Sequence, residues 1–139
     1  MADISKLVRL QIVLVVLFIF FKAIRPSALN SDSPEQFKTM LLSLPNFFES
    51  VIGTLLLTAI GLVLNSKLNA ARQVRPQIVY IVAVAAGGVY VVTQELKIHN
   101  IGGENVYDQN DVIYSLIGLV SAYLMIIYKK PRIYDEAPK

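Results

Sequence analysis

The sequence predicts an all-α membrane protein, a bundle of four transmembrane helices with a short interfacial helix between the first two. The first observation is composition: the 139 residues are 55% hydrophobic and 17% charged, whereas a typical soluble domain carries about 25% charged residues. The second is that four apolar stretches approach the roughly 20 residues that a membrane-spanning helix needs. These stretches cover about residues 7–24, 47–65, 76–94 and 112–128.

Composition also limits the chemistry. The chain has no cysteine and one histidine, His99, which excludes disulfides and thiolate metal sites and disfavours a histidine-based metal site. We therefore expect no metal and no cofactor. The net charge is +3, but the basic residues flank apolar stretches, so we expect membrane lipids and not nucleic acid to supply the counter-charge. The apolar stretches run along the whole chain, which indicates a single transmembrane domain over residues 1–139.

The first span, about residues 7–24, has a short uninterrupted apolar part. Arg9 and Lys22 flank that part and lie close enough to its ends to extend toward the head groups. The basic start would also fit a signal peptide. However, Lys22 and Arg25 follow the apolar part directly and no small-x-small cleavage site is evident, which favours a helix retained in the membrane.

A short helix over about residues 34–44 is expected to lie in the membrane interface. Ser33 would cap it, Pro34 would take its first position and Gln36 would close a capping box. Apolar residues then recur at helical spacing, and they are Phe37, Met40, Leu41 and Leu44. Pro45 is expected to end this helix before the second span begins.

The other three spans carry small residues, which allow helix backbones to approach closely in a membrane. The glycines that we predict to pack against neighbouring helices are Gly53, Gly61, Gly87, Gly88 and Gly118.

Lysine and arginine positions predict the orientation, because these residues resist transfer across the membrane. One side would hold nine of the 13, namely Lys6, Arg9, Lys67, Arg72, Arg75, Lys129, Lys130, Arg132 and Lys139. The opposite side would hold Lys22, Arg25, Lys38 and Lys97. We therefore predict a multi-pass protein of the cell membrane with both termini in the cytoplasm.

Polar residues gather where the third span ends and the fourth begins. Gln94 and Glu95 end the third span, and Asp108 and Asp111 precede or open the fourth. If these two spans form an antiparallel hairpin, the carboxylates meet at the outer edge of the membrane, where they can hold a proton, a cation or a polar head group. Glu49, at the outer mouth of the second span, would join them.

A plainer interpretation stays open for the same residues. Asp111 would cap the fourth helix and interact favourably with its dipole. The remaining acids would then face water in the loop between the third and fourth spans, and Glu49 would be an ordinary interfacial carboxylate.

The same segment carries a family resemblance. Residues 93–95, with Gln94 and Glu95, are followed by a glycine-containing loop and by residues 107–118, an aromatic-Asp-x-x-Asp element that opens a helix. This pattern, over about the last third of the chain, resembles the VanZ-like membrane proteins. Glu95, Asp108, Asp111 and Gly118 match the family pattern. Ser115 stands where the family usually has asparagine, and residues 103–105 stand where it has an arginine.

The resemblance implies a small multi-span envelope protein associated with resistance to lipid-linked glycopeptide antibiotics. We accordingly expect an outward site that engages a lipid-linked envelope precursor or an amphiphilic antibiotic. Its ligand-binding residues would be Glu95, Asp108 and Asp111, with Gln94 and Ser115 as secondary participants.

Two hypotheses of other classes remain. The glycine faces also suit a structural subunit or assembly factor of a larger membrane complex. A small dimeric transporter or lipid flippase is a third hypothesis, although no charged residue lies in mid-membrane, where such proteins usually have one. No nucleophile stands beside a recognisable base, so the sequence favours a protein that is not an enzyme.

Overall fold

The computed structural model describes residues 2–95 and 109–133. These residues form helices α1 (Ala2–Leu29), α2 (Glu35–Ser66), α3 (Pro76–Glu95) and α4 (Gln109–Lys129), and a short 3-10 helix, η1 (Ala70–Arg72). No strand occurs in the described part of the chain. All four α-helices are long and apolar enough to cross a membrane. The predicted all-α class with four membrane helices is therefore confirmed.

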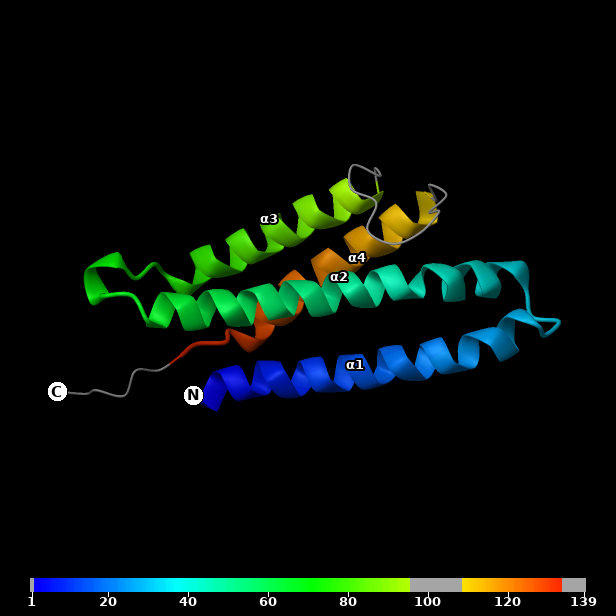
Figure 1. Cartoon of the computed structure of the whole chain (residues 1–139), viewed down its shortest axis with the longest axis horizontal. Helices are drawn as coiled ribbons and strands as arrows, with labels where there is room; N and C mark the ends of the chain where they lie inside the picture. Colours follow the sequence, from blue (N-terminus) through cyan, green and yellow to red (C-terminus); the bar gives the residue numbers. More distant parts are fainter. Residues whose placement is uncertain (1, 96–108, 134–139) are drawn as a thin grey trace.

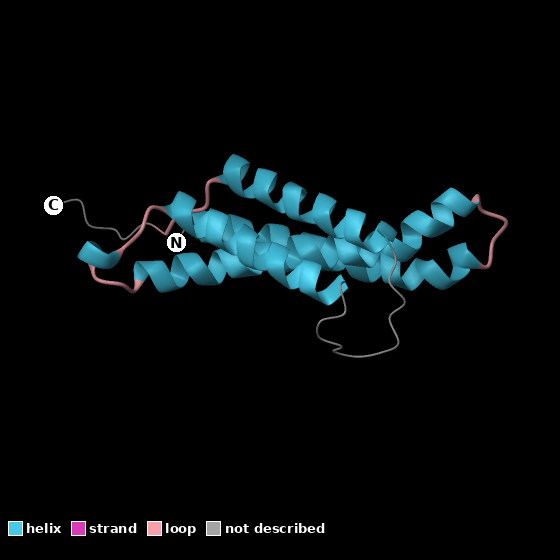
Figure 2. Cartoon of the chain, turned by 90° about the horizontal axis from the view of Figure 1, so that it is seen from above, coloured by secondary structure: helices cyan, strands magenta, loops and turns pink. Residues whose placement is uncertain are grey.

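The four helices run alternately up and down along one long axis (Figure 1). The N-terminus, the α2–α3 connection and the end of α4 lie at one end of the bundle, and the α1–α2 connection lies at the other. Helix α2 is central, because it contacts α1, α3 and α4, whereas α1 packs mainly on α2. Seen from above, the bundle is long and narrow (Figure 2).

The packing of α1 on α2 is aromatic. Phe18 and Phe21 of α1 each place a ring centroid 5.8 Å from that of Phe48 in α2. Such spacing is typical of favourable ring pairs. Phe48 is itself buried in the core, whereas Phe20 of α1 is 57% exposed. Apolar side chains thus cover the outward faces, as a helix surrounded by lipid requires.

The interfacial helix predicted over residues 34–44 is not separate, and the predicted break at Pro45 is wrong. Helix α2 runs for 32 residues with Pro45 inside it. A proline removes one N–H donor, but ending the helix would free several backbone groups next to apolar surroundings, which costs more. Leu41 and Phe48, on either side of the proline, are both buried, so packing also favours an unbroken helix.

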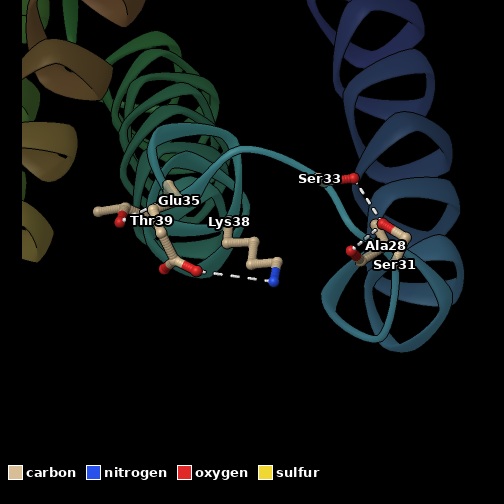
Figure 3. A network of polar contacts seen from close by, with 6 residues as sticks. All are labelled: Ala28, Ser31, Ser33, Glu35, Lys38 and Thr39. Atoms are coloured by element: carbon tan, nitrogen blue, oxygen red, sulfur yellow. Dashed lines mark hydrogen bonds and ion pairs between the residues drawn. The ribbon is translucent and has the colours of Figure 1, made fainter.

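The predicted capping box at Ser33 does not form either. The residue before the helix is Pro34, whose carbonyl accepts from the backbone N–H groups of Phe37 and Lys38. The Ser33 hydroxyl instead lies within hydrogen-bond distance of the Ser31 hydroxyl, which donates to the carbonyl of Ala28 at the end of α1 (Figure 3). The serines therefore stabilise the turn after α1 and not the start of α2.

Candidate functional site

A cavity of about 70 Å³ opens between α2, α3 and α4. Its walls come from the middle of α2, the second half of α3 and the second turn of α4, so it lies nearer the end of the bundle that carries the α1–α2 connection. We call it the polar cleft, after the polar residues that line it: Asn46, Glu49, Ser50, Thr54, Gln94 and Ser115.

Two hydroxyl groups in the polar cleft are buried without a partner. Ser50 is 4% exposed and Thr54 is 1% exposed, and neither hydroxyl has a hydrogen-bond partner among the described residues. Thr58, one turn further along α2, is equally buried but donates to the carbonyl of Thr54 at 2.9 Å. Because a buried polar group without a partner costs about 1–3 kcal/mol, Ser50 and Thr54 are two places where a ligand group would gain a hydrogen bond.

Glycines determine where the helices touch and where the cleft stays open. A Cβ atom at Gly118 of α4 would lie 2.6 Å from the backbone oxygen of Phe47 in α2, and one at Gly87 of α3 would lie 2.8 Å from the Thr54 hydroxyl. A Cβ atom at Gly53 would meet no described atom within 4 Å. Gly118 and Gly87 therefore bring α4 and α3 against α2, and Gly53 leaves space between them.

The two remaining glycines behave differently from each other. A Cβ atom at Gly61 would lie 2.7 Å from a side-chain carbon of Val79, so α2 and α3 approach closely in the half of the bundle without the cleft. At Gly88 the nearest atom, in Leu119, would be 3.7 Å away, an ordinary contact. Close approach thus occurs at Gly61, Gly87 and Gly118 and not at Gly53 or Gly88.

Among the described residues that line the polar cleft, Glu49 is the only charged one. Its side chain is exposed, and it interacts electrostatically with Lys22 of α1. The other polar lining groups are hydroxyls and side-chain amides, which can both donate and accept hydrogen bonds. A cleft with one carboxylate and no lining cation suits hydroxyl, amide or amine groups better than a phosphate.

The structure brings together part of the predicted ligand-binding set. Gln94 and Ser115 both line the polar cleft, and Ser115 is 2% exposed. Asp108 and the side chain of Glu95 lie outside the described residues, so the predicted meeting of the carboxylates stays a prediction. Asp111 is the third residue of α4 and is not among the lining residues. It therefore does not occupy the cap position, although its charge still favours the positive end of the helix dipole.

Three lining residues of α2, namely Asn46, Ser50 and Thr54, were not predicted from the sequence. A signal for them exists in the spacing of the residues that α2 contributes: Asn46, Glu49, Ser50, Gly53, Thr54 and Leu57. Residues three and four positions apart share one face of a helix. When the sequence of this apolar helix is plotted on a helical wheel, an amide, a carboxylate and two hydroxyls therefore fall on one face.

Comparisons with known proteins give no relative. No family model matches the chain, and neither a curated protein nor a solved structure gives a significant match. The function must therefore be argued from the polar cleft.

Proposed function

We propose that this chain is an envelope membrane protein that binds an amphiphile by placing the polar group of the ligand in the polar cleft. The unpaired, buried hydroxyls of Ser50 and Thr54 are the observation that carries the proposal. They are fixed by helix packing and face a cavity large enough for a small polar group. Binding such a group would supply the missing hydrogen bonds.

The surroundings of the cleft favour an amphiphile over a water-soluble ligand. Tyr90 and Leu57 line it and are 55% and 39% exposed. Both residues lie within helices apolar enough to span a membrane. A ligand whose apolar part stays among lipid tails while its polar group enters the cleft satisfies both environments at once.

Two further arguments support a choice among amphiphiles. Glu49 and the hydroxyl and amide groups favour a head group that carries hydroxyls, amides or an amine. The resemblance of residues 93–95 and 107–118 to VanZ-like proteins supports a lipid-linked envelope component or an amphiphilic antibiotic as the source of that head group. On the lysine and arginine count, we expect the cleft to lie in the outer half of the membrane.

The proposal is tested by comparing Thr54→Val with Thr58→Val. Both changes replace a buried threonine hydroxyl by a methyl group, one turn apart, but only Thr54 lines the polar cleft. After gentle solubilisation, mass spectrometry of co-purifying lipids should detect an amphiphile bound to the wild type and to Thr58→Val. Thr54→Val should lose most of it, because the hydrogen-bond partner in the cleft is gone.

The stability of the lipid-depleted proteins separates this result from a folding defect. Thr54→Val removes an unpaired buried hydroxyl, so we expect its free energy of unfolding to rise by about 1 kcal/mol. Equal retention of the same amphiphile by wild type and Thr54→Val would refute the proposed binding site. The antibiotic could also be the ligand, and this version of the proposal is tested in cells that express either the wild type or Thr54→Val at equal levels. Equal tolerance of a lipid-linked glycopeptide antibiotic by the two cell lines would refute it.

The subunit and transporter hypotheses gain no specific support. Gly61, Gly87 and Gly118, which would have served as docking faces, approach other helices of the same chain. Within the part of the chain that the structure describes, the single charged residue that lines the polar cleft is Glu49, whose side chain is exposed. A stoichiometric partner protein that remains bound in the Thr54→Val variant would favour the subunit hypothesis.

A further inference from the structure

A second cavity, of about 110 Å³, lies at the opposite end of the bundle from the α1–α2 connection. Its walls come from the first two turns of α3 and from the end of α4 and the residues that follow (Figure 1). The lining residues are Gln77, Tyr80, Ile127, Lys130 and Arg132. We call this cavity the basic pocket. It shares no lining residue with the polar cleft.

The chain after α4 is held against α3 by a specific contact. The Tyr80 hydroxyl donates to the carbonyl of Pro131. Tyr80 is 5% exposed, and Pro131 is fully buried beside it. One wall of the basic pocket is therefore fixed by a buried hydrogen bond between two elements, and the residues on either side of Pro131 are held in place with it.

Lys130 has an unusual backbone conformation. Its φ angle is 44°, and it is the one non-glycine residue with a positive φ in the described part of the chain. Its N–H donates to the carbonyl of Ile126 at 2.8 Å, which closes the last turn of α4. Glycine normally takes this position because it has no Cβ to clash. A lysine in this conformation is strained, and residues held in strained conformations are concentrated at binding sites.

The charges of the basic pocket are of one sign. Lys130 and Arg132 contribute cations, Gln77 contributes a side-chain amide, and none of the described lining residues is acidic. The N-terminal end of α3 lies at the same place, and the positive end of a helix dipole also attracts anions. Lys130 and Arg132 are both exposed, and guanidinium and ammonium groups that line one cavity are suited to bind phosphate oxygens.

We propose that the basic pocket binds a phosphate group, carried either by an anionic lipid head group or by a soluble phosphate ester. The site lies at the end of the bundle that the lysine and arginine count predicts to be cytoplasmic. It does not depend on the polar cleft: the two sites differ in lining charge, in position and in the ligand chemistry that they suit.

The test compares Lys130→Gln/Arg132→Gln with Lys67→Gln/Arg72→Gln. Both double variants remove two positive charges from the same end of the bundle, but Lys67 and Arg72 do not line the basic pocket. Native mass spectrometry of the purified chain in detergent would follow titrations with phosphatidylglycerol, with phosphatidylcholine and with inorganic phosphate.

We expect the wild type and Lys67→Gln/Arg72→Gln to bind one phosphatidylglycerol with equal affinity. Affinity should fall about fivefold for each pocket cation removed, the factor that corresponds to about 1 kcal/mol per basic residue at an anionic surface. Competition by inorganic phosphate would identify a soluble phosphate ester as the ligand, and its absence would identify the lipid. Equal losses in the two double variants, or no loss in either, would overturn the proposal.

Lys130→Gly separates binding from folding. Glycine relieves the positive φ angle, so this variant should be at least as stable as the wild type. It nevertheless lacks the ammonium group and should bind phosphatidylglycerol about fivefold more weakly. A Lys130→Gly variant that is more stable and binds as well as the wild type would show that the lysine does not contact a phosphate.

Discussion

Gly118 shows how a single missing side chain determines the distance between two helices. A Cβ atom at this position would lie 2.6 Å from the Phe47 backbone oxygen and 2.8 Å from the Cβ of Ser50. Neither atom belongs to a flexible side-chain end, so α4 would have to move away from α2. We expect Gly118→Ala to lower the free energy of unfolding by about 1–3 kcal/mol, the usual cost of overpacking, as measured by denaturation in detergent.

Gly88→Ala is the matched control for Gly118→Ala. Its Cβ would lie 3.7 Å from the nearest atom, in Leu119, which is an ordinary contact distance. Because alanine also favours the helix by about 1 kcal/mol over glycine in soluble helices, this variant should be no less stable than the wild type. Equal destabilisation by both changes would mean that close approach at Gly118 does not hold the bundle together.

At the residue scale, the sequence predicts some of the residues that line the polar cleft and misses others, and each outcome has a physical reason. Gln94 follows from the hairpin of the last two spans and Ser115 from the resemblance to VanZ-like proteins, and both line the polar cleft. Ser50 and Thr54 were missed because a small hydroxyl residue in an apolar helix is normally a packing residue. Nothing in the sequence distinguishes Gly53 from Gly118. In the structure Gly53 faces open space, whereas Gly118 lies against the backbone of α2, and this difference depends on how the helices are arranged.

At the scale of elements, apolar length and composition predict the four helices well. Helix α3 begins at the predicted Pro76, and its last residue, Glu95, is one position beyond the prediction. The prediction fails at Pro45, which was expected to end a helix. Pro26 lies inside α1 and Pro45 lies inside α2, although the general rule is that a proline ends or kinks a helix. In an apolar environment an unbroken helix satisfies more backbone groups than two separate ones.

Pro45→Ala tests whether α2 is one continuous helix. Alanine restores the N–H that proline lacks, and in a continuous helix this N–H donates to the carbonyl of Leu41. We expect the free energy of unfolding to rise by about 1–3 kcal/mol, up to the full cost of an interior proline. Denaturation in detergent measures the change. Pro34→Ala, just outside the helix, should have a much smaller effect.

A different result at Pro45 would reinstate the interfacial helix. If residues 34–44 formed a separate helix that ends at Pro45, alanine would extend that helix and force a new angle at its end. Stability would then fall, and proteases would cut the segment around residue 45 more readily in the variant. Such an outcome would contradict the unbroken α2 and the packing of Leu41 and Phe48 on the two sides of the proline.

At the scale of the whole molecule, the two ends of the bundle differ in chemistry. The polar cleft lies toward the end with the α1–α2 connection, and its described lining residues include one carboxylate, that of Glu49. The basic pocket lies at the other end and has two lining cations, Lys130 and Arg132. The orientation of the bundle in the membrane therefore decides on which side of the membrane each proposed ligand would be bound. Both proposals depend on this topology.

The absence of cysteine makes that topology measurable with single substitutions. Asp32 in the α1–α2 connection and Ala70 in the α2–α3 connection are both exposed and lie at opposite ends of the bundle. Because the end with Ala70 carries most of the lysines and arginines, we expect it to stay in the cytoplasm. A membrane-impermeant maleimide added to intact cells should label Asp32→Cys but not Ala70→Cys. In permeabilised cells the same reagent should label both variants.

The reverse labelling pattern would change the proposals in a defined way. The polar cleft would then open toward the cytoplasmic leaflet, away from an antibiotic that arrives from outside, and an amphiphile of the cytoplasmic leaflet would have to take its place as the proposed ligand. The basic pocket would face outward, away from the anionic lipids of the cytoplasmic leaflet. Labelling of both variants in intact cells would indicate two orientations and would contradict the charge difference as the determinant of topology.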